Sequence, residues 1–244
     1  MAVGARGYVG IDGCRQGNWF CVELGPDDAW DFRVLPIDGV GEFVRTARIA
    51  LIDIPIGLVE SGSEGRACDR DARRLLAPRR GSSVFPAPAR AAVHTRRFAE
   101  AVRINRRLTG RGISRQSWAI APRIRVIDDL LQRDTGLRAV LRECHPEICF
   151  WALNGGTPMR HNKKTVDGRA ERMAALRRFF PAAEALLERA TARFTRRQVS
   201  LDDIVDAMAV AVTAKIGEGR YRTLPPHPVR DATGLPLEMV YCLP

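Results

Sequence analysis

Aspartates at the ends of apolar segments are the residues of this sequence best suited to chemistry. Asp12 ends the apolar run that begins at Tyr8, and Asp53 lies inside the run 51–54. A carboxylate inside an apolar strand is costly unless it is paired, hydrogen-bonded or bound to a metal ion. Ligands of α/β proteins lie at the carboxyl ends of strands, so two adjacent strands would bring both side chains into one site. The alternative for each is a turn or cap aspartate that binds backbone amides.

Two further aspartates lie in a segment with a helical pattern. Asp203 and Asp206 are three positions apart, so they share one face of a helix expected over 201–216. Asp203 also has an ordinary explanation, because an acid in a first turn complements the helix dipole. Asp206 lies deeper, between Val205 and Ala207, where we expect it to be buried and to need a positive partner. That partner is either a metal ion or an arginine.

These four aspartates form a set of oxygen ligands. Clustered carboxylates repel one another unless cations lie between them, and oxygen ligands without His or Cys suit Mg²⁺ or Mn²⁺. Two such ions can clamp the attacking and leaving oxygens of a phosphodiester. Glu143 and Glu147 are further candidates, as ligands or as residues that orient His145; the alternative is a surface acid near a strand end. The candidate catalytic residues are therefore Asp12, Asp53, Glu143, Asp203 and Asp206.

Basic residues are concentrated in one part of the chain. The net charge is +11, and residues 66–125 hold 16 arginines and three acids, whereas the rest of the chain holds 23 basic and 25 acidic residues. A concentrated basic segment is typical of a protein that binds a polyanion. The alternative is a solvated helix face, or an ordinary surface turn in the case of the lysines. The candidate phosphate contacts are Arg66, Arg70, Arg73, Arg79, Arg80, Ser82, Ser83, Lys163 and Lys164.

Strands and helices must position these groups. Three strands over 8–12, 19–24 and 30–34 are expected to form an antiparallel meander, followed by a short helix over 39–48 and a buried strand over 49–54. Later helices are expected over 64–77, 88–109, 121–134, 169–190 and 201–216, and later strands over 137–144 and 237–242. This order predicts an α/β fold with one mixed sheet. We expect a single domain over 1–244, with an Arg-rich helical insertion at 66–135 and a Pro-rich tail at 221–244.

Six short motifs together resemble one known family. They lie at 10–15, 51–57, 68–74, 80–86, 143–147 and 202–207. The family is catalogued as domain of unknown function 429 and is described as predicted nucleases with a ribonuclease H-like fold. The resemblance implies a five-stranded mixed sheet whose first three strands are antiparallel.

The same resemblance implies where metal-binding acids lie. They are expected on the first and fourth strands and on the last helix, the places of Asp12, of Asp53 and of Asp203 with Asp206. The pair on the last helix is similar to the Holliday-junction resolvases. Those proteins usually have glutamate on the fourth strand, where this chain has Asp53.

The composition is that of a globular protein and argues against a membrane-spanning or secreted one. Hydrophobic residues make up 45% and charged residues 27% of the chain, as in ordinary globular proteins. No stretch reaches the ~20 apolar residues of a membrane-spanning helix, and no secretory signal is recognisable, so we expect a cytoplasmic protein. The six cysteines show no C-x-x-C spacing and are expected to be reduced. Neither G-x-G-x-x-G nor a P-loop motif occurs.

The function expected from these patterns is a Mg²⁺- or Mn²⁺-dependent nuclease. DNA or RNA as substrate, endonuclease or exonuclease action, and the oligomeric state stay open. One alternative is a non-catalytic nucleic-acid-binding protein on the same fold. Another is a small-molecule phosphotransferase, which normally needs two lobes of this kind and is disfavoured by the length of 244 residues.

Overall fold

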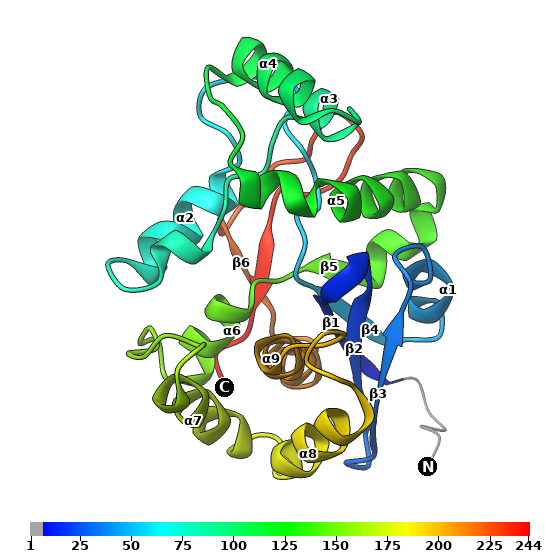
Figure 1. Cartoon of the computed structure of the whole chain (residues 1–244), viewed down its shortest axis with the longest axis vertical. Coiled ribbons are helices and arrows are strands. Elements are labelled where there is room, and N and C mark those ends of the chain that lie inside the picture. Colours follow the sequence, from blue (N-terminus) through cyan, green and yellow to red (C-terminus); the bar gives the residue numbers. More distant parts are fainter. Residues whose placement is uncertain (1–6) are drawn as a thin grey trace.

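A five-stranded mixed sheet organises the chain, and this computed structural model describes residues 7–244 (Figure 1). The sheet order is β3 (Trp30–Leu35), β2 (Trp19–Leu24), β1 (Tyr8–Gly13), β4 (Ile49–Ile52) and β5 (Leu141–Glu143). β1, β2 and β3 are antiparallel neighbours, whereas β4 lies parallel to β1, and β5 lies parallel to β4. The predicted α/β class, the mixed five-stranded sheet and its antiparallel first three strands are confirmed.

Helix α9 (Leu201–Gly217) packs on one face of the sheet, against β1, β2 and β4. The approach is close because β1 carries Gly10: a Cβ there would lie 2.2 Å from the backbone nitrogen of Ala211 and 2.3 Å from the carbonyl oxygen of Ala207. Any larger residue would push the helix away. Gly10 therefore sets the separation between the acids of β1 and those of α9.

The opposite face is covered by α1 (Val40–Val44) and α5 (Arg115–Arg133), whose apolar residues form one core with Val9, Ile11 and Ile52. On the α9 side, α6 (Pro146–Leu153), α7 (Val166–Arg177) and α8 (Ala183–Arg193) surround that helix (Figure 1). The helix expected over 169–190 is thus two helices. Pro181 lies in the break between them and has no N–H to continue the first one.

A helical region joins β4 to β5 and forms the upper part of Figure 1. It contains α2 (Ala67–Leu76), the 3₁₀ turn η2 (Gly81–Ser83), α3 (Arg90–Val93), α4 (Phe98–Thr109) and α5. The helix expected over 88–109 is interrupted at 94–97, because both the backbone N–H and the Oγ1 hydroxyl of Thr95 donate to the carbonyl of Ala92 and close a turn there.

The last part of the chain adds a small second sheet of β6 (Arg222–Leu224) and β7 (Met239–Tyr241). The strand expected over 137–144 is shorter than predicted, since residues 135–139 form a 3₁₀ turn, η3 (Thr135–Ala139). Within residues 7–244, no helix combines the length and the apolar character needed to cross a membrane.

Candidate active site

The ends of β1 and β4 place two aspartates side by side. Ile11 pairs with Ile52 across the parallel strands, and the N–H of Asp53 donates to the carbonyl of Ile11 at 2.9 Å. Side chains alternate along a strand, so Asp12 and Asp53 point to the α9 face, two positions beyond Gly10 and Leu51. Asp206, buried on α9, completes the group on this face.

The three aspartates line one cavity of about 210 Å³. Ser83, Glu143, His145, Glu147 and Lys163 contribute to the same lining. Asp12, Asp53 and Asp206 are three of the four aspartates that were predicted to share one site, and the fold brings these three together.

Asp203 does not line this cavity. Its Oδ2 accepts from the N–H of Ser200 at 2.9 Å, and the Ser200 hydroxyl accepts from the N–H of Asp203 at 3.3 Å. This reciprocal pair is a capping box that stabilises the first turn of α9. The ordinary explanation of Asp203 as an acid of the first turn therefore accounts for its position.

Burial and mutual repulsion shift the titration of Asp12. Burial raises the pKa of Asp12 well above its ordinary value, and the charges of Asp53, Asp206 and Asp203 raise it further, while Lys163 opposes the shift. One oxygen of Asp12 accepts from the N–H of Gly13 at 2.7 Å. A carboxyl group with this shift binds a cation or a proton more readily than an exposed aspartate does.

Asp206 has a lysine as its positive partner. The ammonium of Lys163 lies 2.5 Å from Oδ2 of Asp206 and 3.9 Å from Asp202. Burial raises the pKa of Asp206 to about 6 although Lys163 opposes the shift. Burial alone would lower the pKa of Lys163, but Asp206 and Asp12 outweigh it and raise that pKa. Lys163 was predicted to contact phosphate, and its pair with Asp206 was not predicted because the pair joins a loop to a helix 43 residues later in the chain.

Glu143 lies on the other side of the sheet. It is opposite Ile52 in the β4–β5 register, so its side chain is directed away from α9. The Glu143 carboxylate accepts from the N–H of Ile56 at 2.6 Å and forms a buried ion pair with Arg66. Burial raises the pKa of Glu143, and Arg66 opposes this shift. Glu143 still contributes to the cavity wall, but its partner is Arg66.

Arg66 was predicted to contact phosphate, and the structure places it elsewhere. Only 1% of Arg66 is exposed, and its guanidinium lies between Glu143 and Asp69, the latter at 3.7 Å. The helical spacing of the arginines gave no sign that this one turns inward, because the acid that draws it lies 77 residues away on β5. In this fold Arg66 is a buried structural cation.

His145 and Glu147 begin α6. Nδ1 of His145 accepts from the N–H of Glu147 at 3.2 Å and caps the helix. The buried carboxylate of Glu147 pairs with Arg172 at 2.5 Å, and its second oxygen has no hydrogen-bond partner in the described part of the chain. Glu147 is therefore a buried, ion-paired residue of the cavity wall rather than a surface acid.

The three aspartates of the cavity have donor atoms that suit a metal ion. Carboxylate oxygens are the donors that Mg²⁺ and Mn²⁺ prefer, so the chemistry of Asp12, Asp53 and Asp206 fits such an ion. Among residues 7–244, only one group of three His, Cys, Asp or Glu residues has its ligand atoms within 4.8 Å of one another, and this group is Cys68, Asp69 and Glu143. Arg66 already supplies a positive charge to that group. The three aspartates of the cavity are more widely spaced, as expected for carboxylates that repel one another.

Several predicted phosphate contacts hold loops in place. Arg73 donates to the carbonyl of Val84 at 2.7 Å, and Arg80 donates to the carbonyls of Met159 and Arg160. Arg80 thereby ties the η2 loop to the segment that leads to Lys163. Arg70 donates to the carbonyl of Glu64, whereas Arg79, Ser82 and Lys164 are exposed.

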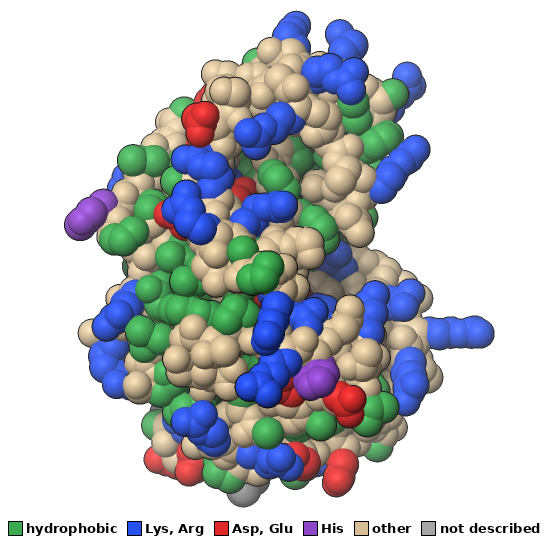
Figure 2. Space-filling view, turned by 90° about the vertical axis from the view of Figure 1, so that its left-hand side faces the viewer, with side chains coloured by type: hydrophobic (Ala, Val, Ile, Leu, Met, Phe, Trp, Pro, Cys, Tyr) green, Lys and Arg blue, Asp and Glu red, His purple; other side chains and the backbone are tan. Residues whose placement is uncertain are grey.

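Positive charge is widespread on the surface. On the face drawn in Figure 2, Lys and Arg side chains stand out on the upper part of the molecule and recur around the hollow at mid-height. These side chains give the protein a surface that attracts anions.

The fold and this site define an α/β protein with a carboxylate-lined cavity at the carboxyl edge of a mixed sheet. A family model described as "Protein of unknown function (DUF429)" matches residues 10–230, and the chain belongs to this family. No curated protein and no solved structure matches the chain.

Proposed function

We propose that the protein is a Mg²⁺- or Mn²⁺-dependent nuclease with a ribonuclease H-like fold. The observation that carries this proposal is the convergence of Asp12, Asp53 and Asp206 on one cavity from β1, the end of β4 and α9. These are the places that the family resemblance implies for metal-binding acids. The antiparallel first three strands of the sheet support the same fold.

Each residue of the cavity has a role in this proposal. Bound Mg²⁺ or Mn²⁺ would neutralise phosphate charge and lower the pKa of a water molecule that attacks phosphorus. Asp12, Asp53 and Asp206 line the same cavity and would hold such ions together through their carboxylate oxygens. Lys163 favours the ionised form of Asp206, which is the form that would bind a cation.

The class of substrate follows from charge. Residues 66–125 carry an excess of arginine, and one of these arginines, Arg123, lines the acidic cavity. Basic surroundings attract the phosphate backbone, and a metal-loaded carboxylate site accepts a single phosphodiester. A nucleic acid presents both features, so we propose a DNA or RNA strand as substrate.

Cleavage by the purified full chain tests the proposal. Single- and double-stranded DNA and RNA are incubated with Mn²⁺, with Mg²⁺ and with EDTA. We expect cleavage that needs the metal and falls by at least about 100-fold in Asp12→Asn, because a preorganised charge at the reacting phosphate is removed. The control is Asp27→Asn, in the exposed turn between β2 and β3, which should keep full activity. Cleavage that survives in Asp12→Asn contradicts this active site.

A non-catalytic nucleic-acid-binding protein is the second candidate function. The observation that favours it is Lys163, whose ammonium already neutralises part of the acidic group. Calorimetric titration with Mn²⁺ distinguishes the two functions. A nuclease binds Mn²⁺ and loses this binding in Asp206→Asn, whereas the alternative binds nucleic acid in a salt-dependent way without binding Mn²⁺.

A further inference from the structure

A second cavity adjoins the acidic one and has the opposite charge. Its volume is about 260 Å³, and it shares Lys163 and Asp206 with the first cavity. Apart from the acids Asp202 and Asp206, its charged lining is basic. The basic side chains are Arg15, Lys163, Lys164, Arg169, Arg172 and Arg196.

Most of these cations have no partner in the protein. Lys163 pairs with Asp206, and Arg172 pairs with Glu147. Within residues 7–244, the side chains of the other four cations form neither an ion pair nor a hydrogen bond; they belong to Arg15, Lys164, Arg169 and Arg196. Arg172 is 1% exposed and its guanidinium is held by Glu147, so the unpaired charge of this cavity comes from the other four cations.

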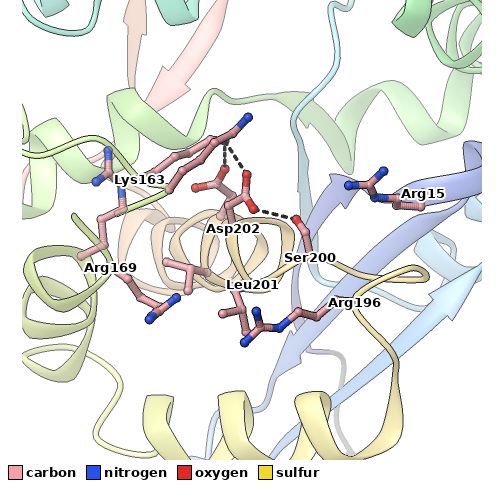
Figure 3. A pocket seen from close by; sticks show the side chains of 11 residues that line it. Arg15, Lys163, Arg169, Arg196, Ser200, Leu201 and Asp202 are labelled. Carbon is pink, nitrogen blue, oxygen red and sulfur yellow. Dashed lines mark hydrogen bonds and ion pairs between the residues drawn. The ribbon is translucent and has the colours of Figure 1, made fainter. Parts of the chain in front are cut away.

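These side chains reach the cavity from three separate parts of the chain (Figure 3). Arg15 follows β1, Lys164 precedes α7, Arg169 lies in the first turn of α7, and Arg196 precedes α9. The N–H of Arg15 donates to the carbonyl of Gln198 at 3.2 Å, which ties the segment after β1 to the one before α9. The backbone thus holds like charges around one space, an arrangement that an anion would stabilise.

The geometry points to a binding site for a second phosphate of the substrate, beside the phosphate that is cleaved. This inference rests on the proposed function, since Lys163 and Asp206 form the wall between the two cavities. Three arginine forks and a lysine offer donors in several directions, which suits the tetrahedral oxygens of phosphate. The phosphate is either a terminal monophosphate or the next phosphodiester of the strand, and the experiment separates these sources.

Binding to oligonucleotides in EDTA tests the inference without any cleavage. Fluorescence anisotropy is measured with short single strands that carry a 5′-phosphate, a 3′-phosphate or only hydroxyl ends. Arg169→Gln/Arg196→Gln should weaken binding at least about tenfold and lower the salt dependence of log K by about 1–2. Arg220→Gln/Arg222→Gln is the matched control, because it removes the same charge from residues that line neither cavity.

Inorganic phosphate gives a readout that does not need a nucleic acid. At constant ionic strength, phosphate should raise the melting temperature of the wild type and of the control variant. The same addition of phosphate should not change the melting temperature of Arg169→Gln/Arg196→Gln, because a ligand stabilises only a protein that binds it.

Each outcome decides a separate point. A preference for one phosphorylated end that disappears in the cavity variant identifies a terminal phosphate, and equal affinity for all ends identifies an internal one. The inference is overturned if the cavity variant binds oligonucleotides as tightly as the control variant does, regardless of how phosphate affects the melting temperature. It is also overturned if the wild type binds neither oligonucleotides nor phosphate. Cleavage with Mn²⁺ is measured separately, so a protein that binds as expected but does not cleave contradicts the proposed function alone.

Discussion

Two clusters of acids lie near the same edge of the sheet, on opposite faces. On the α9 face, Asp12, Asp53 and Asp206 surround a cavity with Lys163 as their cation. On the other face, Asp69 and Glu143 enclose the guanidinium of Arg66.

The clusters differ in exposure and in charge balance. The side chain of Arg66 is 0% exposed, so the cation of this cluster is shut off from solvent, although Asp69 and Glu143 also contribute to the wall of the cavity. The side chain of Lys163 is 37% exposed, and it faces three carboxylates that open onto a cavity. A closed cluster with its own cation serves folding. The open cluster has three acids to one cation, whereas the closed cluster has two acids to one cation. This larger excess of negative charge gives the open cluster an affinity for further positive charge, which is the property that a metal site needs.

The largest expected effect is the loss of Arg66. Arg66→Met leaves Glu143 and Asp69 buried without their cation, which should lower the free energy of unfolding by about 3–5 kcal/mol at neutral pH. Urea denaturation measures this loss. The control is Arg74→Met, whose side chain is 78% exposed and whose loss should cost no more than about 0.5 kcal/mol. Equal stability of the two variants would show that the buried cluster is not held by charge.

The open cluster should respond to pH in the opposite way to an ordinary ion pair. The pKa of Asp206 is raised from 3.8 to about 6, so the folded state binds its proton more tightly than the unfolded state does. Stability should therefore fall as pH rises from about 4 to about 6, by on the order of 1–3 kcal/mol from this group. Asp206→Asn should remove this part of the pH dependence and be at least as stable as wild type at pH 8 without metal.

Thermal melts across this pH range, with and without Mn²⁺, measure the effect. The wild type should gain stability from Mn²⁺ at pH 8, and Asp206→Asn should gain less, because a ligand stabilises only the state that binds it. Asp27→Asn, an exposed substitution outside both clusters, should follow the wild type. A large loss of stability in Asp206→Asn at every pH would instead assign Asp206 a structural role like that of Glu143.

The smallest expected effect lies outside both clusters. Arg79 is exposed and was predicted to contact phosphate, so Arg79→Gln should lower the salt dependence of log K for nucleic acid by about 1. The free energy of unfolding should stay within about 0.5 kcal/mol of wild type. Binding measured over a range of salt concentrations gives the slope. An unchanged slope would place Arg79 off the binding surface.

Local patterns predicted the antiparallel first three strands, the buried fourth strand and three of the acids. The apolar runs that contain Asp12 and Asp53 were predicted to be strands because they are short and are bounded by glycine or proline. Asp206 was recognisable because a carboxylate among small apolar residues of a helix needs a partner. These inferences depend on residues close together in the sequence.

The cations that partner these acids depend on tertiary structure. Lys163 reaches Asp206 across 43 residues, and Arg66 reaches Glu143 across 77, distances at which no periodicity links two positions. The sequence contains 36 arginines and three lysines, and each of them was a plausible surface cation before the fold placed it. The face of the sheet to which Glu143 points was likewise undetermined from the sequence, because it depends on the pairing of Glu143 with Ile52.

Residue type and local pattern therefore determined which acids are costly to bury and where the chain forms strands. Only the tertiary structure decided which charges pair. An ion pair forms between side chains that become neighbours when α9 packs on the sheet and β5 joins its edge. Gly10 is an example: the sequence predicts that it lies in a short strand. Only the tertiary structure shows that α9 packs closely against it, which brings Asp206 near Asp12.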